Sequence, residues 1–309
     1  MREYDCIIVG GGLAGLQAAI QLGRYSSHQV LVVDAGEGRS TLCRTYHNIL
    51  GFPEGVSGEE LRSKGRIQAE KTGVAFEKDR IVKAERVGEQ VQLTGSSGTI
   101  YSARTVLLAT GLSDRFPAIP GLRPTLGRSV YVCPDCDGYE IQDRRTILLG
   151  SGEAGANMAM ILIERTNDLL YINHEQKPIS AELHRSMKEA GVRYLEAAVQ
   201  EVQQTEDGYI TGVLTEDGQI YESERGFIAF GGNRVHFELA EQLGAVIADN
   251  KHVEADHRSL QAAPNVWIAG DLGLHAEQAT VAMGEGSIAA IWIHKELQKI
   301  KKENKVKQL

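Results

Sequence analysis

The chain has 309 residues, of which 42% are hydrophobic and 24% charged, and its net charge is −8. Length and composition are typical of a globular protein of two domains, and the acidic balance disfavours a nucleic-acid partner. No apolar run approaches the roughly 20 residues that a membrane-spanning helix needs, and the first residues lack the pattern of a secretory leader. We therefore expect a cytoplasmic chain that has no membrane partner.

The first 34 residues predict a strand, a glycine turn, a helix and a second strand. The apolar run 5–9 precedes Gly10-Gly-Gly-Leu-Ala-Gly15, and the run 30–33 ends at Asp34. In such a unit the first glycine permits a tight turn, the second admits a pyrophosphate close to the backbone, and the third lets helix and strand pack. The acid can accept a hydrogen bond from a ribose hydroxyl. The residues expected to hold this nucleotide are Gly10, Gly12, Leu13, Ala14, Gly15 and Asp34.

A second unit of the same plan follows later in the chain. A strand over 145–149 leads into Gly150-Ser-Gly-Glu-Ala-Gly155, a helix to about Arg165 and a strand over 168–172. Two such units predict two bound nucleotides. The residues expected to hold the second one are Gly150, Gly152, Gly155 and Glu175.

Two further strands end in small residues, which let a cofactor come close to the backbone. The run 105–109 ends at Thr110-Gly111, and the run 266–269 ends at Gly270-Asp271. A helix over 277–290 then follows, and its N-terminal dipole could stabilise negative charge on a reduced flavin. This pattern favours FAD in the first unit. Its further expected contacts are Thr110, Gly111, Gly270, Asp271, Gln278 and Ala279.

The order of these segments predicts an α/β fold with two Rossmann-like dinucleotide-binding domains, the second inserted into the first. The first domain would be discontinuous, over 1–113 and 237–309, and the second would span 114–236. Residues 76–101 and 192–230 each read as antiparallel strands, which would complete a three-layer ββα arrangement in each domain.

Among the four cysteines, only Cys133 and Cys136 are closely spaced. In an intracellular chain this spacing indicates redox chemistry or a metal, and zinc is the weaker interpretation because Cys6 and Cys43 do not form a second close pair. Flavin can accept hydride and pass two electrons to a disulfide. One cysteine must then reach the flavin while its partner attacks the substrate, and Asp137 could exchange the required proton.

With both glycine loops and the cysteine pair in place, the chain resembles the low-molecular-weight thioredoxin reductases over nearly its whole length. The motifs that carry the resemblance include Asn48-Ile-Leu-Gly-Phe-Pro-Glu-Gly55 and Cys133-Pro-Asp-Cys-Asp-Gly138. The resemblance implies that Asn48 contacts the flavin, that Cys136 faces it and that Cys133 attacks the substrate disulfide. It also implies a homodimer, domain rotation during turnover, and a thioredoxin-like protein or small disulfide as substrate.

The electron donor depends on a departure from the family pattern. Where the family has His-Arg-Arg to hold the 2′-phosphate of NADPH, this chain has Asn173-His-Glu-Gln-Lys177. Glu175 would repel a 2′-phosphate and favours NADH, whereas His174 and Lys177 could supply positive charge. We therefore expect NAD(P)H as the donor. A ferredoxin-dependent reductase and a small-molecule dithiol oxidase without nicotinamide use remain open.

Three further points bear on the site. Glu277 stands where the family commonly has arginine, and the segment 36–43 is shorter than its counterpart, so the flavin surroundings differ. Cys43 partly matches the catalytic cysteine of single-cysteine coenzyme A disulfide reductases, but we expect it to be a packing thiol. His275 could donate a proton near the flavin.

A non-catalytic FAD-binding redox regulator is the alternative of another class, and the retention of Asp137 with both cysteines argues against it.

Overall fold

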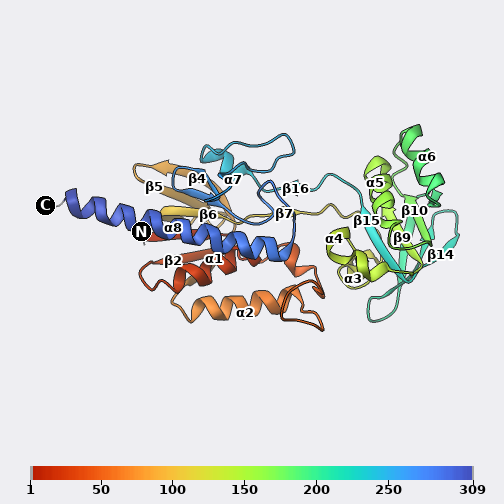
Figure 1. The fold of residues 1–309 in the computed structure, drawn as a ribbon, viewed down its shortest axis with the longest axis horizontal. Helices are drawn as coiled ribbons and strands as arrows, with labels where there is room; N and C mark the ends of the chain where they lie inside the picture. Colours follow the sequence, from red (N-terminus) through yellow and green to blue (C-terminus); the bar gives the residue numbers. More distant parts are fainter. Residues whose placement is uncertain (1–2, 308–309) are drawn as a thin grey trace. The chain divides into compact units, whose positions relative to one another are not determined.

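The computed structural model describes residues 3–307, which form two compact units (Figure 1). The first unit holds the chain up to Thr41, Gly58–Ser113 and the chain from Arg234 onward. The second unit holds Leu42–Ser57 and Asp114–Asn233. The second unit therefore interrupts the first.

Two segments depart from the expected division, which placed residues 42–57 within the first domain and residues 234–236 within the second. Residues 234–236 group with the first unit. Leu42–Ser57 groups with the second unit instead. Arg44 donates its backbone N–H to the carbonyl oxygen of Gly127 at 3.2 Å, and a Cβ added at Gly127 would lie 2.4 Å from the Leu42 carbonyl oxygen. This close backbone packing attaches the segment to the inserted unit. The outermost expected bounds, 1 and 309, lie outside the described residues.

An eight-stranded sheet forms the centre of the first unit, from β1 (Glu3–Val9), β2 (Val30–Asp34), β3 (Ala75–Lys78), β4 (Ile81–Val87), β5 (Gln90–Gly95), β6 (Ile100–Leu108), β17 (Gln261–Ala263) and β18 (Val266–Ile268). β1 runs parallel to both β2 and β6, so Val9 lies opposite Val33 on one side and Leu108 on the other. Most residues of β1 and β2 are buried. Such burial is typical of parallel strands that are covered on both faces.

The expected antiparallel layer over 76–101 forms only in part. β4 pairs antiparallel with β5, and β5 pairs antiparallel with the first half of β6. β3, however, runs parallel to β2, with Ala75 opposite Leu31. The prediction was wrong for β3, because the outer edge of β2 provides a continuous parallel ladder for it.

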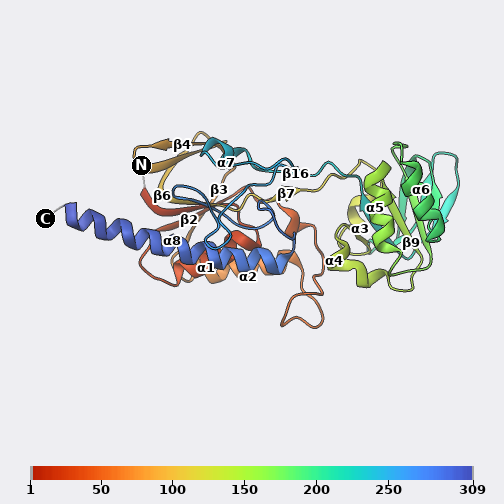
Figure 2. The ribbon, with the colours of Figure 1, turned by 45° about the horizontal axis from the view of Figure 1, so that its top comes forward.

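Helices cover the sheet of the first unit, namely α1 (Leu13–Gly23), η1 (Arg39–Thr41), α2 (Gly58–Glu70), α7 (Glu238–Gln242) and α8 (Ala279–Lys307). α1 and α8 lie side by side on one face of the sheet (Figures 1 and 2), and β4, β5 and α7 pack on the other. The two long helices approach closely, because a Cβ added at Gly286 would lie 2.2 Å from the Ala14 carbonyl oxygen. A short ladder of β7 (Leu112–Ser113) and β16 (Arg234–Val235) completes the unit.

The second unit repeats the three-layer plan around a five-stranded parallel sheet, formed by β8 (Val130–Tyr131), β9 (Thr146–Gly150), β10 (Leu169–Asn173), β11 (Arg193–Leu195) and β15 (Arg225–Ala229). One face is covered by α5 (Gly152–Leu162) and α6 (Ala181–Glu189). The other carries β12 (Val199–Gln204), β13 (Ile210–Thr215) and β14 (Ile220–Glu222). The expected antiparallel layer over 192–230 therefore forms only in part, because β11 and β15 run parallel to their neighbours in the central sheet. Three short helices complete it, α3 (Leu122–Thr125), α4 (Pro134–Asp137) and η2 (Gly138–Ile141).

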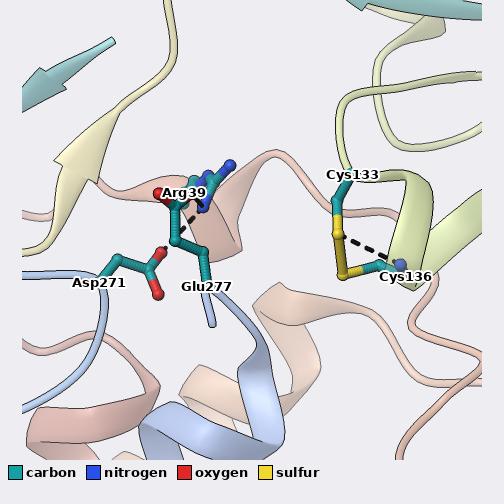
Figure 3. Close-up of a disulfide and its surroundings, with 5 residues drawn as sticks. All are labelled: Arg39, Cys133, Cys136, Asp271 and Glu277. Atoms are coloured by element: carbon teal, nitrogen blue, oxygen red, sulfur yellow. Dashed lines mark hydrogen bonds and ion pairs between the residues drawn. A yellow bond between two sulfur atoms is a disulfide. The ribbon is translucent and has the colours of Figure 1, made fainter. Parts of the chain in front are cut away.

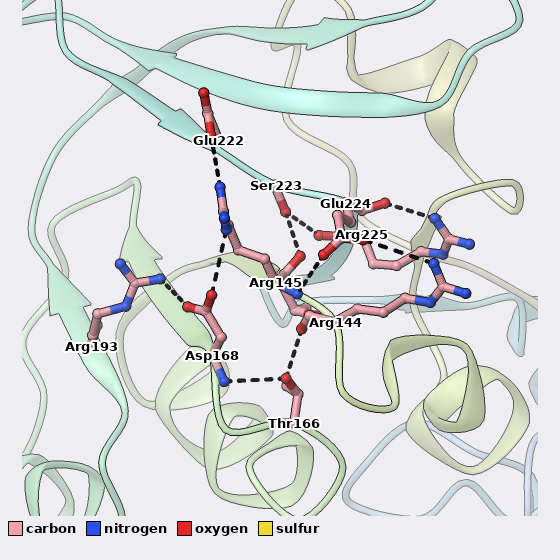
Figure 4. Close-up of polar contacts among 10 residues, drawn as sticks. Arg144, Arg145, Thr166, Asp168, Arg193, Glu222, Ser223, Glu224 and Arg225 are labelled. Atoms are coloured by element: carbon pink, nitrogen blue, oxygen red, sulfur yellow. Dashed lines mark hydrogen bonds and ion pairs between the residues drawn. The ribbon is translucent and has the colours of Figure 1, made fainter.

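A polar network joins the strands of this sheet at the end opposite the glycine loop (Figure 4). The guanidinium of Arg145 pairs with Glu222 at 2.7 Å and with Asp168 at 3.5 Å, and its backbone carbonyl accepts the Glu224 N–H at 2.9 Å. These side chains are largely exposed, so the ion pairs add little stability. The network aligns strand starts and carries no group suited to redox chemistry.

We expect Gly155→Ala to lower the free energy of unfolding by about 1–3 kcal/mol, the usual cost of an extra methyl in a packed core. An added Cβ would lie 2.4 Å from the ring of Tyr171, which is fully buried and donates its hydroxyl to the Gly152 carbonyl oxygen at 2.8 Å. Urea unfolding measures the change. The control is Gly284→Ala in α8, where an added Cβ meets nothing within 4 Å among the described residues. A Gly155 variant as stable as this control would contradict the packing argument.

Within residues 3–307, no helix combines the length and the apolar character that crossing a membrane requires.

Candidate active site

The first glycine loop leaves open space where a pyrophosphate would bind. Gly10 has a φ of +108°, and a Cβ there would lie 2.3 Å from the Ala109 carbonyl oxygen, so the turn packs against the end of β6. At Gly12, in contrast, an added Cβ would meet no described atom within 4 Å. The hydrogen-bond ladder of α1 begins with the Leu16 N–H, which donates to the Gly12 carbonyl oxygen at 2.9 Å. The N–H groups of the preceding residues in α1 lack partners within the helix and suit an anion.

Asp34 lies beside this loop, at the end of β2. Its Oδ1 accepts the Gly11 N–H at 3.0 Å, and its Oδ2 accepts from Nη2 of Arg62 at 2.8 Å. A carboxylate has about four acceptor positions, so Asp34 can still accept a ribose hydroxyl. Arg62, which the sequence analysis did not single out, keeps this side chain oriented.

The ends of β6 and β18 carry the other residues expected around the flavin. The hydroxyl of Thr110 donates to the His236 carbonyl oxygen at 2.8 Å, and Gly111 follows with a φ of +59°. Gly270 has a φ of +77° and donates its N–H to Oε2 of Glu285 at 2.8 Å. α8 begins at Ala279, directly after Gln278, and not at residue 277 as expected. This part of the first unit therefore supplies a glycine-lined cradle at a helix N-terminus.

An arginine bridges two acids in this cradle (Figure 3). Nη1 of Arg39 lies 3.1 Å from Oδ2 of Asp271 and 2.6 Å from Oε2 of Glu277. Burial raises the pKa of Asp271, and the Arg39 guanidinium opposes that rise. The Arg39 guanidinium therefore favours the charged form of Asp271.

His275 lies in the loop between β18 and α8. Its Nε2 is 2.8 Å from Oε2 of Glu285. This hydrogen bond raises the pKa of His275 to about 9. His275 is therefore protonated at neutral pH.

The second glycine loop differs from the first in what surrounds it. The β9–β10 register sets Asn173 opposite Gly150, and Oδ1 of Asn173 accepts the Gly152 N–H at 2.9 Å. Asn173 thus takes the position that Asp34 has in the first unit, while Glu175 lies two residues beyond the strand. At Gly152 an added Cβ would lie 3.0 Å from Cβ of Lys177 and 3.2 Å from the Pro178 carbonyl oxygen. The chain after β10 therefore folds close over this loop.

A cavity of about 580 Å³ remains beside the second loop. This volume suits a cofactor-sized ligand. Its walls come from the start of α5, from the segment after β10 and from Phe230, and its lining residues are Ser151, Gly152, Glu153, Ala154, Lys177, Pro178, Ile179, Ser180 and Phe230.

Glu175 is held between two cations. It pairs with Arg115 and, at 2.9 Å, with Nζ of Lys177. The Ser151 hydroxyl and the Arg115 guanidinium lower the pKa of Glu175 to about 2. The acid is therefore ionised but neutralised by its partners.

His174 does not supply the positive charge suggested by its position in the sequence. Its Nδ1 accepts the backbone N–H of Val199 at 2.8 Å, which requires that nitrogen to be unprotonated. Burial also lowers the pKa of His174. The cations near the second loop are therefore Arg115 and Lys177.

The cysteine pair lies at the start of the short helix α4. Cys133 and Cys136 form a disulfide, with their Cα atoms 5.3 Å apart. The Cys136 N–H points at Sγ of Cys133, at 3.2 Å. Such a donor favours a thiolate on Cys133 once the disulfide is reduced.

Asp137 follows the pair directly. Burial, together with the nearby charge of Glu140, raises the pKa of Asp137 to about 7. This carboxyl group can therefore both donate and accept a proton at neutral pH. Cys43 is different, because burial and the Asp137 charge raise the pKa of its thiol to about 12, and it stays protonated.

Comparison with known proteins identifies the chain. Residues 4–286 match the family described as pyridine nucleotide-disulphide oxidoreductase. The chain belongs to this family. The oxidoreductase is 30% identical to a thioredoxin reductase from Mycolicibacterium smegmatis, over 93% of this chain and 94% of that protein. It is 28% identical to a protein named "Probable thioredoxin reductase" from Arthroderma benhamiae, over 98% of this chain and 82% of that one.

A solved structure agrees with these relatives. The crystal structure of HlmI matches with a TM-score of 0.88 and 25% identity, and covers 98% of this chain and 95% of its own. The oxidoreductase is thus an FAD-dependent enzyme of the thioredoxin reductase type, in a family that uses FAD and NAD(P)H as cofactors. The predicted family, α/β fold and cofactors are confirmed.

Sequence reasoning missed several residues that the structure places at these sites, among them Asn173, Arg39, Arg62, Arg115 and Glu140. Asn173 could have been found by aligning the two glycine units, because it falls where Asp34 falls. The sequence carries no local signal for Arg39 or Arg62, whose partners are 232 and 28 residues away. Glu140 follows the cysteine motif in the sequence, but its effect on the pKa of Asp137 depends on the burial of that side chain.

Proposed function

We propose that this oxidoreductase transfers two electrons from NAD(P)H through FAD to the Cys133–Cys136 disulfide, and from the resulting dithiol to the disulfide of a thioredoxin-like protein or small molecule. The observation that carries the proposal is the cysteine pair at the start of α4, directly followed by a carboxyl group with a pKa of about 7. Bound FAD supplies the chemistry that links hydride transfer to disulfide reduction.

Cys133 and Cys136 have different roles in the proposed reaction. The thiolate of Cys133, supported by the Cys136 N–H, attacks one sulfur of the substrate disulfide and forms a mixed disulfide, while the other substrate sulfur leaves with the electron pair. Cys136 then attacks Cys133, which releases the reduced substrate and restores the intramolecular disulfide. Asp137 donates a proton to a departing thiolate and accepts one in the opposite half of the cycle.

The remaining assignments concern the cofactors and the assembly. The FAD ligands in the proposal are those of the first glycine loop, Asp34 and the cradle around Asp271, and Asn48 stays a prediction. We also propose the discontinuous division near residues 113 and 237, which the order of the segments favours, and a cytoplasmic location, which the composition favours. A homodimer is proposed from the family resemblance. Light scattering of the purified protein tests the dimer.

The electron donor can be tested at Glu175. We expect Glu175→Gln to raise the preference for NADPH over NADH roughly tenfold, which corresponds to ~1.4 kcal/mol. The carboxylate now neutralises Arg115 and Lys177, and without it both cations can attract a 2′-phosphate. The ratio of kcat/KM for the two coenzymes is the measurement. Glu164→Gln removes an exposed acid from the same unit and serves as the control; equal ratios in both variants would contradict the assignment.

A second candidate function is a small-molecule dithiol oxidase, or a ferredoxin-dependent reductase, that makes no use of a nicotinamide. The observation that favours it is a difference between the two glycine loops. Lys177 and Pro178 lie close to Gly152 in the second loop, whereas the corresponding Gly12 in the first loop has open space beside it. In addition, the Gly152 N–H already donates to Asn173. Both features leave less of the second loop available to a pyrophosphate.

One anaerobic titration separates these candidates. The absorbance of the oxidised flavin is followed while NADPH, NADH, reduced ferredoxin and a small dithiol are added in separate samples, and thioredoxin is then added to each. Bleaching by a nicotinamide and recovery with thioredoxin are expected for the proposed reductase. Bleaching only by ferredoxin, or only by a small dithiol, would replace it with the corresponding alternative.

A further inference from the structure

The acids of the first nucleotide site are each held by an arginine from the same stretch of chain. Arg62 on α2 binds Asp34 at 2.8 Å, and Arg39 on η1 binds Asp271 at 3.1 Å. η1 is itself fixed against α2, because a Cβ added at Gly58 would lie 1.8 Å from the Ser40 carbonyl oxygen. The two arginines therefore reach the two acids from one rigid corner of the first unit.

Arg39 is placed to control both the charge and the position of the loop before α8. Its Nη1 bridges Asp271 and Glu277, at the two ends of the loop that leads from β18 into the helix. Its side chain is 21% exposed and that of Asp271 only 18%. A bridge this sheltered from water is screened less than a surface ion pair and can orient its partners.

We infer that Arg39 is a positioning residue for FAD, which fixes the Asp271 carboxylate so that it can accept a hydrogen bond from the ribityl chain of the cofactor. The inference rests on the proposed role of Asp271 in the flavin cradle. Arg39 thus supplies from η1 the positive charge that position 277, a glutamate in this chain, does not provide.

The charged groups around Asp271 determine how FAD binding should depend on pH. Arg39 favours the ionised carboxylate, Glu277 opposes it, and protonated His275 favours it. Nε2 of His252, whose side chain is largely buried, lies 3.7 Å from Oε1 of Glu277. Arg39 is the one member of this set whose cationic state does not depend on pH, because guanidinium groups stay protonated.

The test measures the dissociation constant of FAD as a function of pH, with apoprotein and no donor or disulfide present. We expect Arg39→Ala to weaken FAD binding at neutral pH by roughly ten- to a hundredfold, by analogy with the loss of partners that orient metal-binding side chains. In wild type, affinity falls as acid protonates Asp271, and in the variant this fall moves to higher pH. Arg39→Lys should recover part of the affinity, because it keeps the charge but loses the planar fork.

Two comparisons show whether the effect runs through Asp271. In an Asp271→Asn background, Arg39→Ala should add little further loss, because contacting residues that act together are not additive. The control is Arg80→Ala. Arg80 pairs with Glu37, close to Arg39 in the sequence, but this ion pair is largely exposed, so its loss should leave FAD binding unchanged. Circular dichroism verifies that each variant is folded, and Arg39→Lys still tests the inference if Arg39→Ala does not fold.

Additive losses, or an Arg39→Ala variant with the pH dependence of wild type, would overturn the inference. Neither result would touch the proposed function, which is judged by wild-type turnover of disulfides. Conversely, wild type without disulfide turnover would remove the proposed function and leave the FAD measurements intact.

Discussion

Cys133→Ser and Cys136→Ser are each expected to reduce disulfide turnover by a factor on the order of 10³ or more, since each removes a group that the reaction cannot replace. A single remaining thiol cannot form the intramolecular disulfide that releases the product. FAD binding should be unchanged, because the expected FAD residues belong to other segments of the chain. Turnover of a small aromatic disulfide and the flavin absorbance of the purified variants measure the two effects.

Two controls sharpen this expectation. The double variant should be no slower than either single variant, because the two cysteines act as one unit. Cys43→Ser should keep full turnover, since burial and the Asp137 charge hold its thiol in the protonated, unreactive form. Normal turnover in either single variant of the pair, or its loss with Cys43→Ser, would rule out the assigned mechanism.

Asp137→Asn is expected to lower turnover by about 10²–10⁴-fold, the usual contribution of a positioned general acid or base. Its pKa of about 7 lets the carboxyl group exchange protons in both halves of the cycle, and an amide cannot do so. Where proton donation limits the rate, turnover should fall as pH rises through about 7. In Asp137→Asn this limb of the pH profile should be absent.

Glu140→Gln tests the cause of the shift without removing the proton carrier. Glu140 adds to the effect of burial in raising the pKa of Asp137, so its neutralisation should move the limb to lower pH. The matched control is Asp135→Asn, which removes a neighbouring acid that is not among the causes of the shift. If Asp137→Asn keeps the wild-type profile, the proton carrier is another group.

The same shift predicts a stability effect whose sign can be derived. The folded chain holds a proton on Asp137 up to about 7, whereas the unfolded chain loses it near 3.8. The folded state therefore binds more protons between these values, and the free energy of unfolding contributed by this group falls as pH rises through that window. Asp137→Asn should remove this part of the pH dependence, which urea unfolding at several pH values would show.

The sequence by itself determined the two nucleotide units and the cysteine pair. Glycine loops between apolar strands predict nucleotide binding. Gly10 and Gly15 must be glycine, because an added Cβ would lie too close to a backbone oxygen at either position. The spacing of Cys133 and Cys136 restricted them to the same short turn. These signals are local, and a local pattern of sterics and polarity can be read without knowing the fold.

Only the tertiary structure decided how the acids of the sites are balanced. Glu175 reads as a lone acid in sequence, but Arg115 reaches it from 60 residues away, and Asn173 takes the place beside the second loop that Asp34 has in the first. Arg39 likewise meets Asp271 and Glu277 only because η1 packs on α2. Charge pairing and burial depend on which distant segments fold together, and that is why pKa values and partners could not be obtained from the order of residues alone.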